Sequence, residues 1–342
     1  MYETGLLTDL LASETTGGIL PIETPEQWKG KSEDIRARIL EVLGPFPSIA
    51  CALEPEIQAS TETEHYVRHK VCFTTEPGER VPSYLMIPKE LAGPLPAILC
   101  LHQTVAQGKD EPAGLSGSPD LFSAHHLAER GYVVLAPDHI CAGERLERGL
   151  GAYDTAPFYE KHPEWSAVGK TIWDARRAVD YLASLEEVDP KRIGCMGHSL
   201  GGTSTVFAAA FDERIRAAVS SCGLTTFAED SNRLAWARDH WYIYMPKLRP
   251  VFLGNEAAPF DWHEVVSLIA PRAFLNASAL NDSCFAKTDA LAELGVRVSK
   301  VYRLLGAEEC FANFLHGSGH GFNAEARALA YAWLDRWLKE TA

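Results

Sequence analysis

The chain has 342 residues, of which 46% are hydrophobic and 23% are charged, a composition ordinary for a folded globular protein. No apolar run approaches the roughly 18 residues that a transmembrane helix needs, so we expect no membrane partner. Aspartate and glutamate outnumber lysine and arginine by 46 to 32, which gives a net charge of −14. This charge argues against a nucleic-acid partner, because such binding requires a basic surface.

The first residues contain no basic segment ahead of an apolar stretch, so we expect no secretory signal and a cytoplasmic location. The eight cysteines form no C-x-x-C pair and no spacing with histidine that is typical of zinc sites. We interpret them as small buried side chains in a reducing compartment, and we expect no metal site.

Residues 1–60 carry the signals of a helical N-terminal extension. Thr24 precedes a proline and stands three positions before Gln27, which is a capping-box pattern. Apolar residues then recur at helical spacing until Gly44, which a proline follows. We therefore predict an extension over residues 1–60 and a main domain over residues 61–342.

The main domain opens with a hairpin pattern. Strand-like runs at residues 65–74 and 81–87 flank a Glu-Pro-Gly-Glu segment that favours a turn. Short continuous apolar runs follow, as is typical of strands buried on both faces of a parallel sheet. We expect these strands at residues 97–101, 132–135, 193–196, 217–219 and 273–275, and a further strand at residues 300–305.

Helical patterns separate these strands and close the chain. The alternation of strand and helix predicts an α/β fold with a mostly parallel, doubly wound sheet that an antiparallel hairpin opens. We expect the helices at residues 121–130, 166–185, 200–211, 288–294 and 323–338.

One segment, residues 223–265, is far longer than an ordinary connection between two strands. It is rich in aromatic residues, so it forms either a packed subdomain or a lid over a site. Ligands of open parallel sheets bind at the carboxyl ends of the strands, where this insertion leaves the sheet. We therefore name Trp236, Trp241 and Tyr244 as candidate substrate-binding residues, with packing inside the insertion as the alternative.

The motif that carries chemistry is Gly-His-Ser-Leu-Gly-Gly at residues 197–202. It follows a predicted strand and precedes a predicted helix, which is the context of the G-x-S-x-G nucleophile elbow. The turn is so tight that a Cβ atom at Gly197 or Gly201 would clash. The elbow would present the hydroxyl of Ser199 at a helix N-terminus, where negative charge is favoured.

A serine nucleophile needs a base that a third group orients, and on this architecture the order along the chain is serine, acid, histidine. Asp282 stands just past a predicted strand and is the candidate acid, with Glu229 or Asp230 in reserve. His320 lies between glycines just before the last helix and is the candidate base, with His316 as its rival.

These motifs resemble the α/β-hydrolase superfamily. The elbow at 197–202, the Ala-Pro-Arg-Ala-Phe-Leu run ahead of Asp282 and the Gly-His-Gly-Phe at 319–322 carry the resemblance. Within the superfamily the chain is similar to the dienelactone hydrolase and acetyl xylan esterase-like branch, over roughly residues 65–340. The segments at 81–88 and 136–145 are similar to that branch as well.

An oxyanion hole needs two backbone N–H groups aimed at the developing charge. One is expected from Leu200, which follows the nucleophile. The other is expected from the loop after the strand at 97–101, where we favour Gln103 and rank Thr104 second. Many relatives have His-Gly here, so Gln103 departs from the family pattern. Asp138 and Arg145 bracket another strand-end loop, either as a structural ion pair or as a contact to an acidic group of the substrate.

The leading hypothesis is a serine carboxylic ester hydrolase that acts through an acyl-enzyme on a small or sugar-linked ester and needs no metal or organic cofactor. A peptidase of the prolyl-oligopeptidase type is the first alternative, although such enzymes usually carry a large domain before the hydrolase. A non-catalytic binding module on the same fold is the second. The expected partner is a small-molecule ester, and the sequence gives no indication of oligomeric state.

Overall fold

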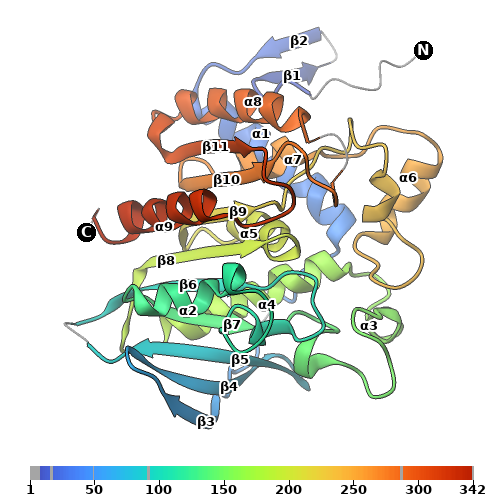
Figure 1. Cartoon of the computed structure of the whole chain (residues 1–342). Coiled ribbons are helices and arrows are strands. Elements are labelled where there is room, and N and C mark those ends of the chain that lie inside the picture. Colours follow the sequence, from blue (N-terminus) through green and yellow to red (C-terminus); the bar gives the residue numbers. More distant parts are fainter. Residues whose placement is uncertain (1–7, 16–17, 49, 91–92, 286–287, 341–342) are drawn as a thin grey trace.

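The computed structural model describes residues 8–15, 18–48, 50–90, 93–285 and 288–340. The first seven residues, on which the expected absence of a secretory signal depends, lie outside this part. Within it, the centre of the fold is a nine-stranded sheet (Figure 1). In spatial order its strands are β11 (Phe311–His316), β10 (Ala273–Ala279), β9 (Ile215–Ser221), β8 (Val188–His198), β6 (Leu95–Leu101), β7 (Val133–Pro137), β5 (Glu79–Pro88), β4 (Tyr66–Glu76) and β3 (Glu56–Glu62).

The sheet is parallel on one side and antiparallel on the other. All neighbours from β11 to β7 pair in parallel. The pairs β7–β5, β5–β4 and β4–β3 are antiparallel. The predicted architecture, a mostly parallel sheet opened by an antiparallel hairpin, is therefore confirmed. The carboxyl ends of the parallel strands meet along one edge, where the site is assembled.

Helices cover both faces of the sheet (Figure 1). Along β6 the buried side chains alternate, with Leu99 packing in one core and Ile98 and Cys100 in the other. The helices α2 (Ser123–Glu129) and α9 (Ala324–Leu338) complete the second core. The first core contains α1 (Pro25–Leu43), α4 (Ala167–Ala183), α5 (Leu200–Phe211), α7 (Trp262–Ser267) and α8 (Ala290–Leu304).

The N-terminal extension is only partly helical. The capping box of Thr24 and Gln27 starts α1, as the sequence indicates. Ahead of it, β1 (Ala12–Thr15) and β2 (Gly18–Pro21) form a small antiparallel sheet, which the helical prediction missed. Ile35 and Ile39 of α1 are fully buried in the same core as the main sheet. The division at residue 60 stays a prediction, and β3 extends across it.

The predicted strand at residues 300–305 is wrong, because these residues lie in or just after α8. The buried residues of α8 recur at intervals of three and four, and Val298, Val301 and Tyr302 belong to this series. A window of six residues does not distinguish that period from a strand. The last strand is β11, at Phe311–His316, which directly precedes the loop that holds His320.

The insertion at 223–265 contains little regular secondary structure and many contacts between aromatic rings. Phe227 packs against the rings of Trp236, Phe252, Phe260 and Trp262. The segment contains α6 (Arg249–Leu253), which lies at the right in Figure 1, together with two short 3-10 helices, η4 (Arg233–Trp236) and η5 (Pro246–Leu248).

A single buried carboxylate joins the two ends of this insertion. Asp261 accepts the backbone N–H groups of Phe227 at 2.8 Å and Ala228 at 2.9 Å, close to where the insertion leaves β9. It also accepts the N–H of Trp262 at 2.6 Å, as the cap of α7. The insertion therefore begins and ends at nearly the same point.

Two further observations bear on the sequence analysis. In the described part of the chain, the helices are too short or too polar for any of them to cross a membrane. All eight cysteines are free, and Cys100 and Cys195 are buried in strands as expected. The expectation that all eight are buried is wrong for Cys284, which is exposed, and for Cys51 and Cys310, which are half-buried. One more helix, α3 (Ala156–Lys161), packs beside the hairpin end of the sheet.

We predict that Ile39→Ala lowers the free energy of unfolding of the whole protein by about 2–5 kcal/mol, because it leaves a cavity in the shared core. Urea denaturation followed by circular dichroism measures this change. Glu41→Ala, on the exposed side of the same helix, should cost less than about 0.5 kcal/mol. If the midpoint of the main unfolding transition is the same in Ile39→Ala as in the wild type, then α1 is not part of the core of the main domain.

Candidate active site

Ser199 occupies a strained turn between β8 and α5. Its backbone lies at φ 53° and ψ −118°, which side-chain-bearing residues rarely adopt. The turn is held by the Ser199 N–H, which donates to the carbonyl oxygen of Ser221 on β9 at 2.8 Å. Ser199 is also the first residue ahead of α5, so its side chain stands at a helix N-terminus.

The flanking glycines have no room for a side chain. A Cβ atom at Gly201 would lie 2.0 Å from the carbonyl oxygen of Leu101 at the end of β6. One at Gly197 would lie 2.4 Å from the carbonyl carbon of Gly201. Both contacts are far inside van der Waals distance, so the elbow exists only with glycine at these positions.

The three residues predicted to act together form one hydrogen-bonded chain. The Oδ2 atom of Asp282 lies 2.7 Å from Nδ1 of His320, and Nε2 of His320 lies 2.9 Å from Oγ of Ser199. An ionised carboxylate only accepts, so the proton of the imidazole lies on Nδ1. Nε2 is then free to accept the proton of the Ser199 hydroxyl.

Asp282 is held as a carboxylate. Burial of its side chain, which is 1% exposed, opposes ionisation. The hydrogen bond from His320 and the backbone N–H groups of Cys284 and Phe285, at 2.7 and 3.1 Å, outweigh this effect and lower the pKa of Asp282. The reserve acid Asp230 accepts the N–H of Asn232 instead and is not bonded to the histidine.

The two other histidines near the site have different partners. Nδ1 of His316 accepts the N–H of Ser318 at 3.3 Å, and burial lowers the pKa of His316. His198, inside the elbow, packs its ring against those of His320 and Phe322, and its Nδ1 atom forms a hydrogen bond with the hydroxyl of Ser221 on β9. Burial first, and the neighbouring His320 second, lower the pKa of His198 to about 3. It is therefore a neutral residue that packs beside the catalytic base and does not compete with it.

Ser199 lines a small cavity of about 80 Å³, and residues of the insertion form part of its wall. Two of the three predicted substrate-binding residues, Trp236 and Tyr244, line it, and Trp236 stacks on Phe285. Trp241 does not line it: this ring is 48% exposed and donates its indole N–H to the carbonyl of Ala152. The lining residues are Thr104, Ser199, Leu200, Thr203, Asp230, Asn232, Ala235, Trp236, Arg238, Tyr244, Cys284 and Phe285.

The loop after β6 favours Thr104 over Gln103 as an oxyanion donor. The side chain of Gln103 turns away to Glu111, at 2.8 Å. The backbone carbonyl of Gln103 accepts hydrogen bonds from the hydroxyl of Tyr153 at 3.1 Å and from the N–H of Val105 at 2.9 Å. In a trans peptide bond the C=O and the N–H point in opposite directions. The N–H of Thr104, which shares its peptide bond with the Gln103 carbonyl, therefore faces away from Tyr153 and Val105. Thr104 also lines the cavity, as does Leu200, whereas Gln103 does not.

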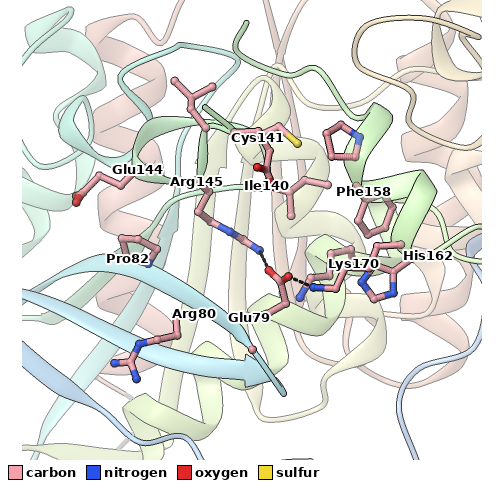
Figure 2. Close-up of a pocket in the computed structure, with 15 residues that line it drawn as sticks. Glu79, Arg80, Pro82, Ile140, Cys141, Glu144, Arg145, Phe158, His162 and Lys170 are labelled. Atoms are coloured by element: carbon pink, nitrogen blue, oxygen red, sulfur yellow. Dashed lines mark hydrogen bonds and ion pairs between the residues drawn. The ribbon is translucent and has the colours of Figure 1, made fainter. Parts of the chain in front are cut away.

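A larger cavity, of about 350 Å³, lies away from Ser199 near the β4–β5 turn and α3. Figure 2 shows Arg145 turned toward Glu79 inside it. Arg145 also pairs with Asp174 at 2.8 Å, while Asp138 pairs with the buried Lys109 at 2.8 Å. Asp138 and Arg145 are therefore structural residues whose charges are satisfied within the protein, and they do not reach the Ser199 cavity.

In the described residues, Cys222, Asp282 and His320 form the one cluster with ligand-type atoms close enough for a metal, within 4.8 Å. Asp282 and His320 are already bonded to each other, and burial raises the pKa of the Cys222 thiol to about 12. A protonated thiol is a poor metal ligand, so this donor set does not fit a metal ion at neutral pH. That the protein needs no metal or cofactor stays a prediction.

The sequence analysis did not identify Arg238, which lines the cavity. Its segment also contains Arg233, Lys247 and Arg249, and no pattern in the sequence distinguishes one of these cations from another.

The fold, the elbow and the hydrogen-bonded chain define an α/β-hydrolase. Residues 16–295 match the Abhydrolase family, and the chain belongs to it. The YtaP protein of Bacillus subtilis (strain 168), named as a hydrolase, is 29% identical over 314 residues, which are 89% of this chain and 98% of that one. These findings confirm the predicted superfamily and the prediction of a hydrolytic enzyme.

Two proteins named as esterases are also similar. Carbohydrate esterase MZ0003, from an unknown prokaryotic organism, is 27% identical over 173 residues, 46% of this chain and 38% of that protein. The structure of a glucuronoyl esterase from Solibacter usitatus superimposes with a TM-score of 0.75 at 20% identity, covering 96% of this chain and 97% of that one. The names agree with the esterase branch that the sequence resembles.

We predict that Gly201→Ala prevents the native turn, because the new methyl group would lie 2.0 Å from the Leu101 carbonyl. The expected result is a melting temperature lowered by several degrees or more, or loss of folded protein, in thermal unfolding. The matched control is Gly317→Ala in the His320 loop, where a Cβ atom meets nothing within 4 Å and the melting temperature should hardly change. A Gly201→Ala protein as stable as the wild type would contradict the packing described for the elbow.

Proposed function

We propose that the protein is a serine-dependent carboxylic ester hydrolase that acts through an acyl-enzyme on a small or sugar-linked ester. The observation that carries this proposal is the pair of hydrogen bonds that links Asp282, His320 and Ser199. Oδ2 of Asp282 lies 2.7 Å from Nδ1 of His320, and Nε2 of His320 lies 2.9 Å from Oγ of Ser199. A serine on a strained turn, a base within hydrogen-bond reach and an acid that orients the base are the parts that acyl transfer requires.

In the proposed mechanism Ser199 is the nucleophile. Its Oγ atom attacks the acyl carbon while Nε2 of His320 takes the hydroxyl proton. His320 then gives this proton to the leaving alcohol as the ester bond breaks. Water attacks the acyl-enzyme with His320 again as base, which releases the acid and restores the serine. Asp282 keeps the imidazole in the required tautomer and stabilises its positive charge.

We assign the oxyanion hole to the backbone N–H groups of Leu200 and Thr104. Leu200 is the first residue of α5, where the N–H groups of a helix have no partner inside the helix. The positive end of the helix dipole adds to the stabilisation of the tetrahedral oxyanion. Thr104 replaces Gln103, the first choice from the sequence, because it lines the cavity and its N–H points away from Tyr153.

We assign substrate contact to the insertion at 223–265, chiefly through Trp236 and Tyr244. Their rings line the cavity beside Ser199. A cavity of about 80 Å³ encloses only a small part of a substrate, which fits a short acyl group with the rest of the ester outside. The esterase names of two similar proteins, one for carbohydrate and one for glucuronoyl esters, support a sugar-linked alcohol or acyl part.

Ser199→Ala is expected to lower kcat for para-nitrophenyl acetate by roughly 10³ to 10⁶, with the oxyanion donors left intact. A fluorophosphonate probe should label the wild type once, on the peptide that contains Ser199. Ser318→Ala, an exposed serine of the His320 loop, should keep both activity and labelling. Retention of most activity in Ser199→Ala, or a label on another peptide, would sink the serine mechanism.

Asp282→Asn should lower kcat by about 10² to 10⁴, because an amide leaves His320 in the wrong tautomer. His320→Ala should cost as much as Ser199→Ala, whereas His316→Ala should be mild. Asp230→Asn is the control for the acid, since Asp230 is near the site but not bonded to the histidine. Equal losses of kcat in Asp230→Asn and Asp282→Asn would leave the assignment of the acid without support.

A further inference from the structure

We propose that the ester substrate carries a carboxylate close to its scissile bond and that Arg238 binds this group. The inference rests on the proposed ester hydrolysis and narrows its substrate class. It starts from the contents of the cavity at Ser199. Among the described residues that line it, Arg238 is the single lysine or arginine.

The guanidinium of Arg238 is held in place without being neutralised. Its central carbon lies 5.1 Å from the ring centre of Trp241 and 5.8 Å from that of Tyr244. Contacts to ring faces fix the plane of the group and leave the N–H donors at its edge available. In the described part of the chain no carboxylate or carbonyl forms an ion pair or hydrogen bond with Arg238, and Asp230 in the same cavity is no exception.

Two neighbouring arginines of the insertion differ in this respect. Arg249 pairs with Asp239 and donates to the carbonyl of Ala237. Arg233 donates to Asn255 at 2.8 Å and to a backbone carbonyl of the same segment. Their donors are engaged within the protein, whereas Arg238, which lines the cavity, has no such partner among the described residues.

The overall charge of the protein makes this cation informative. With a net charge of −14, the molecule repels anions at long range, so an anionic substrate needs a local positive group. A neutral ester would gain little from a guanidinium with unused donors. A carboxylate, by contrast, matches the planar fork of arginine and accepts two parallel hydrogen bonds.

The size of the cavity limits the distance between the two functional groups. Ser199 and Arg238 line one cavity of about 80 Å³, so the carboxylate and the ester carbonyl are separated by a few bonds. This fits a monoester of a short dicarboxylic acid or an ester of an acidic sugar or hydroxy acid. Trp241, which does not line the cavity, then acts as a positioning residue by fixing the guanidinium.

The test uses two pairs of esters in which a carboxylate is replaced by a carboxamide of the same shape. For the acyl side the pair is mono-para-nitrophenyl glutarate and para-nitrophenyl glutaramate. For the alcohol side it is meta-acetoxybenzoate and meta-acetoxybenzamide. The wild type should prefer the carboxylate of one pair by about 10- to 100-fold in kcat/KM, the worth of a charge-assisted hydrogen bond. The preference should shrink as salt is added.

Arg238→Gln should remove this preference through a higher KM for the carboxylate and a much smaller change for the carboxamide, and Arg238→Lys should keep part of it. Arg233→Gln, in the same segment but outside the cavity, should behave as the wild type does. Equal kcat/KM for both members of each pair in the wild type, or equal losses on both in Arg238→Gln, would overturn the role of Arg238. Ser199-dependent hydrolysis of the carboxamides would then still uphold the esterase, whereas no hydrolysis of any of the four esters would overturn both proposals.

Discussion

The close contact between the Ser199 turn and the end of β6 is the constraint on which the site depends. Gly201 packs so tightly on the Leu101 carbonyl that a single added carbon would lie 2.0 Å from it. This contact fixes the elbow to the sheet and holds the strained backbone of Ser199. A strain of this kind, of order 1–3 kcal/mol, persists only where the surrounding structure leaves no alternative. The two buried cores on either side of the sheet provide that rigidity.

The parallel strands bring the other groups to the same place. β8 ends at the serine, β10 is followed by Asp282, and β11 is followed by the loop of His320. The register pairs β10 with both β9 and β11, so the carboxyl ends of these strands lie side by side. The sheet therefore provides the position of the reacting groups, and the insertion provides most of the remaining walls of the cavity, including Trp236 and Arg238.

Features that depend on neighbouring residues could be predicted from the sequence, and features that depend on distant contacts could not. The glycine at 201 and the cap at Thr24 are local requirements of a turn and of a helix start, and both lie where the sequence places them. The secondary structure of residues 300–305 is ambiguous in the sequence, because the apolar residues of so short a window fit both the period of a helix and that of a strand. The preference for Thr104 depends on a hydroxyl from a distant loop, and the exposure of Arg238 to the cavity depends on the fold of the whole insertion.

The hydrogen bonds of Asp261, which join the two ends of the insertion, affect how the substrate specificity of such an enzyme can change in evolution. Because this carboxylate holds Phe227, Ala228 and Trp262 together, the intervening chain is a closed loop whose ends stay fixed whatever its length. Lengthening such a loop adds only a slowly growing entropic cost, about 0.6 kcal/mol for each doubling. Evolution or protein engineering can therefore replace this loop by one of different sequence or length. Such a replacement would change the substrate specificity, while the strands that carry the reacting groups keep their positions.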